Sequence, residues 1–103
     1  MKQGTTPSDD VRLTAWCHGT VQGVGFRWWV AGQAKELNLA GAATNYPDGR
    51  VLVTAEGERT AAEELLRRLQ PGAQGLQPRR PGHVTTTVEV WGTPRGLTGF
   101  QRR

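Results

Sequence analysis

The alternation of apolar and polar positions predicts a chain of short strands interrupted by two helices. Every second residue is apolar over residues 11–17, which is typical of a strand with one buried face. From Phe26 the apolar spacing changes to three or four residues, which predicts a helix that ends near Gly41. The same spacing predicts a second helix over residues 60–70, which Pro71 ends.

Further strands follow each predicted helix. Residues 42–46 and 50–56 flank a Pro-Asp-Gly turn and therefore predict a hairpin. Residues 84–91 alternate again, and the apolar face of this strand is predicted to carry Val84, Thr86, Val88 and Val90. Residues 100–103 could add a short final strand. This order predicts an α+β fold, the ferredoxin-like α/β sandwich (βαββαβ), with two helices on one face of a mainly antiparallel four- to five-stranded sheet.

The length and composition of the chain indicate one small domain. We expect residues 1–9 to form a disordered polar tail and residues 10–103 to form the domain. The start of the chain has no apolar segment typical of a signal peptide, and no apolar run is long enough to span a membrane. The lack of such segments predicts no membrane partner. The lone Cys17 fits a reducing compartment, so we expect a cytoplasmic protein. The scattered histidines and cysteine predict no metal site.

The net charge of +4 is unevenly distributed along the chain. Residues 65–103 contain seven arginines and one acidic residue, Glu89. This excess could mark a nucleic-acid-binding surface, or it could be a solvated basic surface that attracts small anions. The second interpretation is favoured, because aromatic residues are not interleaved with the arginines as stacking on nucleic acid would require. These arginines are Arg67, Arg68, Arg79, Arg80, Arg95, Arg102 and Arg103.

A glycine-rich stretch joins the first predicted strand to the first predicted helix. Its sequence is Gly19-Thr-Val-Gln-Gly-Val-Gly-Phe-Arg27. Free backbone N–H groups at the start of a helix attract anions, and glycine lets the backbone approach a ligand closely. Arg27 adds a planar fork that matches two phosphate oxygens. Glycine spacing alone is a weak signal, and the absence of a following Gly-Lys-Ser/Thr excludes a nucleotide P-loop.

The full sequence of this stretch is more specific than its glycine content, because residues 19–27 resemble the signature of the acylphosphatase family. The second signature of that family follows at the expected distance, as Gly41-Ala-Ala-Thr-Asn45, Asp48-Gly-Arg-Val51 and Glu56-Gly57. The weaker family pattern covers most of residues 10–103.

The resemblance implies a metal-independent and cofactor-free hydrolase that converts acyl phosphates to a carboxylate and inorganic phosphate. It assigns phosphoryl binding to the Arg27 side chain and water positioning to Asn45. The same role in phosphoryl binding falls to the backbone N–H groups of Val21, Gln22, Gly23, Val24, Gly25 and Phe26. These parts suit phosphoryl transfer, which needs positioning and charge stabilisation more than covalent chemistry. The partners implied are a small acyl phosphate and inorganic phosphate, bound by a monomer.

Two other functions stay open on the sequence alone, since many proteins share this fold. One is a non-catalytic, anion-binding regulatory module. The other is a small RNA-binding domain, although the exposed face of the central strands offers only Trp16 for stacking. His18 could contact an anion or simply end its strand. Trp28 could be partly buried or could line the rim of a cleft, and Asn45 could be a structural hairpin residue.

Overall fold

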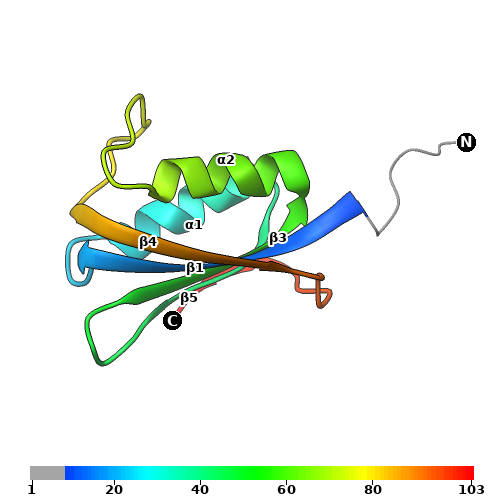
Figure 1. The fold of residues 1–103 in the computed structure, drawn as a ribbon, viewed down its shortest axis with the longest axis horizontal. Helices are drawn as coiled ribbons and strands as arrows, with labels where there is room; N and C mark the ends of the chain where they lie inside the picture. Colours follow the sequence, from blue (N-terminus) through cyan, green and yellow to red (C-terminus); the bar gives the residue numbers. More distant parts are fainter. Residues whose placement is uncertain (1–8) are drawn as a thin grey trace, which may run out of the picture.

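Two helices cover one face of a five-stranded sheet in the computed structural model of the protein, which describes residues 9–103 (Figure 1). In chain order the elements are β1 (Asp10–Thr20), α1 (Phe26–Glu36), β2 (Ala40–Asn45), β3 (Val51–Glu58), α2 (Arg59–Leu69), β4 (His83–Gly92) and β5 (Phe100–Arg102). This arrangement confirms the predicted fold. No described helix is long and apolar enough to cross a membrane. Residues 1–8 of the predicted tail lie outside the described residues, and the domain limits remain a prediction.

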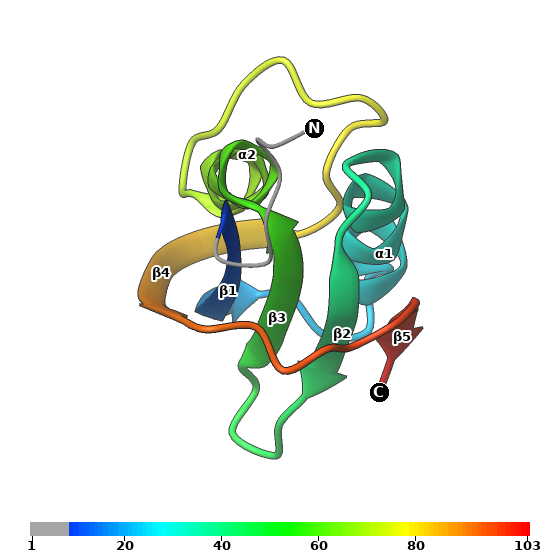
Figure 2. The ribbon, with the colours of Figure 1, turned by 90° about the vertical axis from the view of Figure 1, so that its right-hand side faces the viewer.

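The strand order is β4-β1-β3-β2-β5, so β1 and β3 lie inside the sheet (Figure 2). Neighbouring strands are antiparallel except for β2 and β5, which are parallel. Helix α1 packs over β2 and β5, whereas α2 packs over β1 and β3. The last strand of the chain therefore lies beside the first helix.

The core lies between the two helices and the inner face of the sheet. The buried residues of β1 are those that the alternation predicted, namely Val11, Leu13, Ala15 and Cys17. The largest fully buried side chains come from both helices and from β1, and they are Trp29, Phe26, Leu13, Leu65 and Leu69. Burial raises the pKa of the Cys17 thiol to about 12, against a smaller opposing effect of the positive charge of Arg80. Cys17 therefore packs as a small, uncharged hydrophobe.

The predicted end of the first helix at Gly41 is wrong. Helix α1 ends at Glu36, and Asn38 adopts a left-handed conformation with φ of 59° just beyond it. Gly41 instead lies inside β2, where a Cβ atom would come within 1.9 Å of the carbonyl oxygen of Thr54. The glycine is needed for the close approach of β2 to β3, and it has no part in ending the helix.

The predicted apolar face of β4 is wrong beyond its first residue. Val84 is buried, but Val88 and Val90 are 48% and 58% exposed. The cause is a β-bulge at Thr85, which has no partner in β1 and shifts the register of the strand. Beyond the bulge the other side chains turn inward, and the Thr87 hydroxyl donates a hydrogen bond to a carbonyl oxygen of α2.

Candidate active site

The loop between β1 and α1 presents free backbone N–H groups. Gly23 and Gly25 have φ angles of 73° and 89°, a left-handed conformation that glycine adopts without strain. Gly25 caps α1, and its carbonyl oxygen accepts the first hydrogen bond of the helix, from the Trp29 N–H at 3.0 Å. The N–H groups of residues 22–25 have no hydrogen-bond partner among residues 9–103. The loop can therefore bind an anion at the positive end of the helix.

A pocket of about 360 Å³ opens at this helix end. We call it the cradle, and it is lined by Val21, Gly23, Gly25, Phe26, Arg27, Trp28 and Arg102. Four of the six residues predicted to bind phosphate through their backbone therefore line the pocket, and Gln22 and Val24 do not. Of the described residues that line it, none is acidic and none is a histidine, while two are arginines. The cradle can hold an anion and stabilise its charge, but its lining residues supply no general acid.

Arg27 lies in the first turn of α1, and its side chain is partly buried. Its Nη1 atom donates a hydrogen bond of 2.7 Å to the main-chain oxygen of Arg103, which lies 76 residues further along the chain. The other guanidinium nitrogens make no hydrogen bond within residues 9–103. The contact orients the fork while leaving donors for a phosphoryl group.

Asn45 is the last residue of β2, and its backbone N–H donates to the same Arg103 oxygen at 3.0 Å. This shared acceptor brings the Arg27 guanidinium and the Asn45 backbone to one main-chain oxygen, although Asn45 is not among the residues that line the cradle. The Oδ1 atom of Asn45 is buried, and it is the one buried side-chain polar atom of the described residues that lacks a hydrogen-bond partner. Such an atom costs free energy unless a water or ligand completes it.

The sequence did not reveal a second link between the loop and the hairpin. Nε2 of Gln22 donates two hydrogen bonds, one of 2.7 Å to the carbonyl oxygen of Tyr46 and one of 2.9 Å to that of Arg50. The Gln22 side chain therefore joins the loop to the β2–β3 turn, directly beyond Asn45. The one feature of the sequence that could have indicated this link is that Gln22 has a long polar side chain in a loop of mostly small and apolar residues.

The sequence also missed what the end of the chain contributes. Arg102 and Arg103 are exposed, as expected of solvated charges, but Arg102 also lines the cradle and the main-chain oxygen of Arg103 accepts from Arg27. Trp28 is 62% exposed and lines the cradle, which favours the rim over partial burial. His18 follows the inward-facing Cys17 and lies on the opposite face of the sheet.

Among the described residues, no group of three His, Cys, Asp or Glu could hold a metal ion. The described site has several groups of its own that can act on a substrate. These are two guanidinium groups, a row of backbone N–H groups and one unsatisfied amide oxygen.

Comparison with known proteins places these features in one family. The model of the acylphosphatase family matches residues 13–101. An acylphosphatase of Corynebacterium diphtheriae is 60% identical over 94 residues, covering 91% of this chain and 96% of its own length. One of Corynebacterium glutamicum is 59% identical over 95 residues, covering 92% of this chain and 99% of its own length.

A solved structure shows the same architecture. The structure of an acylphosphatase from Coxiella burnetii superimposes with a TM-score of 0.79 at 27% sequence identity. The match covers 93% of this chain and 95% of that one. The similarity therefore extends over the whole sheet and both helices.

Proposed function

This chain belongs to the acylphosphatase family and is an acylphosphatase, as its sequence predicted, and from that premise we propose how its site works. Arg27 and the N–H groups of residues 21–26 hold the phosphoryl group of a small acyl phosphate. Asn45 positions the attacking water, and no metal ion takes part. The observation that carries this proposal is the buried, unpartnered Oδ1 of Asn45, a residue whose backbone N–H shares the Arg103 acceptor with the Arg27 side chain.

The reaction is an in-line displacement at phosphorus. The oxygen of water forms a bond to phosphorus while the bond from phosphorus to the carboxyl oxygen breaks, and its electron pair leaves with the carboxylate. One proton of the water passes to a phosphoryl oxygen, which yields inorganic phosphate. Oδ1 of Asn45 accepts a hydrogen bond from the water and orients its lone pair toward phosphorus.

The cationic groups stabilise the charge that spreads over the equatorial oxygens of the phosphoryl group. Arg27 retains free donors for two of these oxygens, and the loop amides serve the rest. The carboxylate is a stable leaving group, so the reaction needs no general acid. This agrees with the lack of acidic and histidine side chains among the described residues of the cradle.

The two alternative functions are less well supported. The rings of Trp16 and Tyr46 meet edge-on with their centroids 4.8 Å apart. The guanidinium carbon of Arg50 lies 4.0 Å from the centroid of the Trp16 ring. This tryptophan is therefore a poor platform for an RNA base. A non-catalytic anion-binding module would use the cradle but would give no reason for the unsatisfied Asn45 oxygen.

We also propose that the protein works as a monomer in the cytoplasm. The groups that make up the site come from one chain, on the β1–α1 loop, β2 and β5. The lone cysteine is buried and uncharged, so it needs no disulfide partner.

The decisive experiment is the hydrolysis of benzoyl phosphate by purified protein in excess chelator. We expect full activity without added metal and little activity on alkyl phosphate monoesters, whose alkoxide leaving groups require an acid. A strict requirement for Mg²⁺ would overturn the metal-free mechanism. Equal rates on monoesters would overturn the assigned substrate class.

A further inference from the structure

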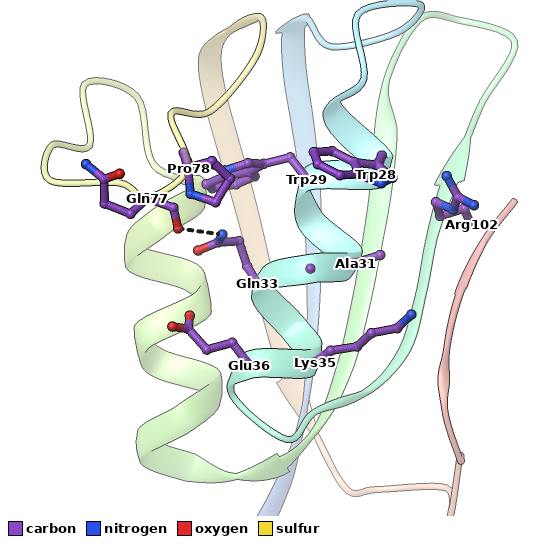
Figure 3. Close-up of a pocket in the computed structure, with 10 residues that line it drawn as sticks. Trp28, Trp29, Ala31, Gln33, Lys35, Glu36, Gln77, Pro78 and Arg102 are labelled. Carbon is purple, nitrogen blue, oxygen red and sulfur yellow. Dashed lines mark hydrogen bonds between the residues drawn. The ribbon is translucent and has the colours of Figure 1, made fainter.

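A second hollow lies next to the cradle, across the exposed face of α1 (Figure 3). It has a volume of about 380 Å³ and is bordered by α1 on one side and by residues 77–78 of the α2–β4 loop on another. We call it the α1 groove. Nothing in the phosphoryl-binding mechanism uses it.

The α1 groove and the cradle adjoin each other. Trp28 and Arg102 line both hollows, and they are the two described residues that the linings share. A substrate whose phosphoryl group lies in the cradle must direct its acyl group away from the loop amides. The groove beyond Trp28 is the adjoining space that can receive it.

The floor of the groove is open because one helical position lacks a side chain. Gly32 lies one turn after Trp28 on the same face of α1, and its φ angle is not positive. A Cβ atom there would meet nothing within 4 Å. Glycine inside a helix costs about 1 kcal/mol relative to alanine, and neither backbone conformation nor crowding requires it here. Its effect on the structure is to leave room beside Trp28.

The far wall of the groove is fixed by hydrogen bonds from buried side chains. Nε1 of Trp29 donates to the carbonyl oxygen of Pro78 at 2.6 Å. Nε2 of Gln33 donates to that of Gln77 at 3.1 Å, the bond that Figure 3 marks. Gln33 is 3% exposed, and its Oε1 accepts from Arg68 at 2.7 Å. The wall is therefore held at a set distance from α1.

We propose that the α1 groove binds the acyl group of the substrate and selects acyl phosphates with a flat, apolar acyl group, such as an aromatic one. This proposal rests on the proposed function. The exposed indole of Trp28 supplies a surface for stacking, Gly32 supplies the space, and the wall formed by Gln77 and Pro78 closes the far side. Trp28 and Gly32 thus determine substrate preference.

The test compares benzoyl phosphate with acetyl phosphate, whose methyl group has no flat face to stack on Trp28. Gly32→Met fills the floor, and we expect the ratio of kcat/KM for benzoyl to acetyl phosphate to fall about tenfold or more, as when an apolar contact of this size is lost. Trp28→Ala should lower the same ratio about three- to tenfold, the size of one aromatic contact. Gly32→Ala should give a smaller decrease.

The matched control is Glu63→Met, which places the same side chain on an exposed position of α2 outside the groove. It should leave the ratio unchanged. The inhibition constant of inorganic phosphate, measured on each variant, reports whether the cradle is intact. An unchanged ratio in both Gly32→Met and Trp28→Ala would overturn the groove proposal while the proposed function stands. Failure of the unaltered chain to hydrolyse either substrate would overturn both.

Discussion

The two regions that meet at the site are held in place by different means. The β1–α1 loop is anchored in the core at both ends, where Val21 and Phe26 are each 1% exposed. Strand β5 has three residues, lies at the edge of the sheet and pairs only with β2. The loop is therefore fixed in the core at both ends, whereas the oxygen that orients Arg27 belongs to Arg103, directly after a short edge strand.

The β1–α1 loop and β5 have different roles in the site. Charge stabilisation requires fixed groups, since donors that must reorganise lose much of their benefit in the transition state. The loop meets this requirement, and the contribution of β5 is to orient Arg27 and Asn45 from outside. Substitutions in the loop should therefore damage catalysis directly, and substitutions that loosen β5 should act through stability and alignment.

The largest effect is expected for Arg27→Ala, which removes the charge from the loop side. It should lower kcat/KM on the order of 10³- to 10⁵-fold, the range for an arginine that stabilises a transferred phosphoryl group. It should also weaken inhibition by inorganic phosphate. Arg27→Lys should rescue little, because lysine keeps the charge but loses the planar fork. Steady-state rates and phosphate inhibition measure both effects; unchanged phosphate inhibition in Arg27→Ala would place the anion site elsewhere.

The second effect concerns Asn45 and distinguishes positioning of the attacking water from binding of the phosphoryl group. Asn45→Ala keeps the backbone N–H that donates to Arg103, so the junction with β5 survives. It should lower kcat about 10²- to 10³-fold, as when one positioned polar group is removed, with phosphate inhibition nearly unchanged. If Asn45 were only a hairpin residue, Asn45→Ala would lower the melting temperature and leave the turnover of the folded protein intact.

A smaller effect is expected for Gln22→Ala, which cuts the tie between the loop and the hairpin. Two hydrogen bonds are lost, and each contributes on the order of 1 kcal/mol. We expect kcat to fall about tenfold, because Asn45 and the cradle lose their relative alignment. Phosphate inhibition should change less, since the loop amides remain. An unchanged kcat would show that the loop and the hairpin are aligned by the rest of the fold.

The loop side of the site could be predicted because its information is local. Alternation, glycine positions and Arg27 all lie within one short segment, so the strand, the loop and the start of the helix follow from neighbouring residues. The fold followed for the same reason, since the order of the elements restricts the possible topologies to a few. The prediction of residue roles came from the family resemblance, because a glycine-rich loop by itself binds nothing in most proteins.

The rest could not be predicted, because it depends on contacts between distant segments. No pattern near Arg27 indicates that its side chain reaches Arg103. The bulge at Thr85 depends on the pairing of two strands, so alternation within β4 alone gave the wrong face. Gly41 looked like the end of a helix, and only the close approach of β3 explains it, since a Cβ atom there would lie 1.9 Å from the Thr54 oxygen.

The smallest effect concerns the connection that leads into β5, and it depends on pH. The Glu56 carboxylate accepts hydrogen bonds from the N–H groups of Arg95, Gly96 and Leu97 at 2.8, 3.1 and 3.1 Å, and from the Arg12 guanidinium at 2.5 Å. Burial alone would raise the pKa of Glu56, but these bonds outweigh it and lower the pKa below its ordinary value of 4.5.

A carboxyl group with a lowered pKa in the folded state stabilises the fold at pH values above its pKa in the unfolded chain. This stabilisation is lost as the pH falls through the lower pKa of the folded state. Glu56→Gln should therefore cost about 1–3 kcal/mol at pH 7, and the difference from the unaltered chain should shrink as the pH falls below about 4.5. Denaturant titrations at several pH values measure it, with Glu63→Gln, at an exposed position, as the control. A difference that stays constant down to acid pH would show that the Glu56 charge does not hold this connection, and that β5 is aligned by its pairing with β2 alone.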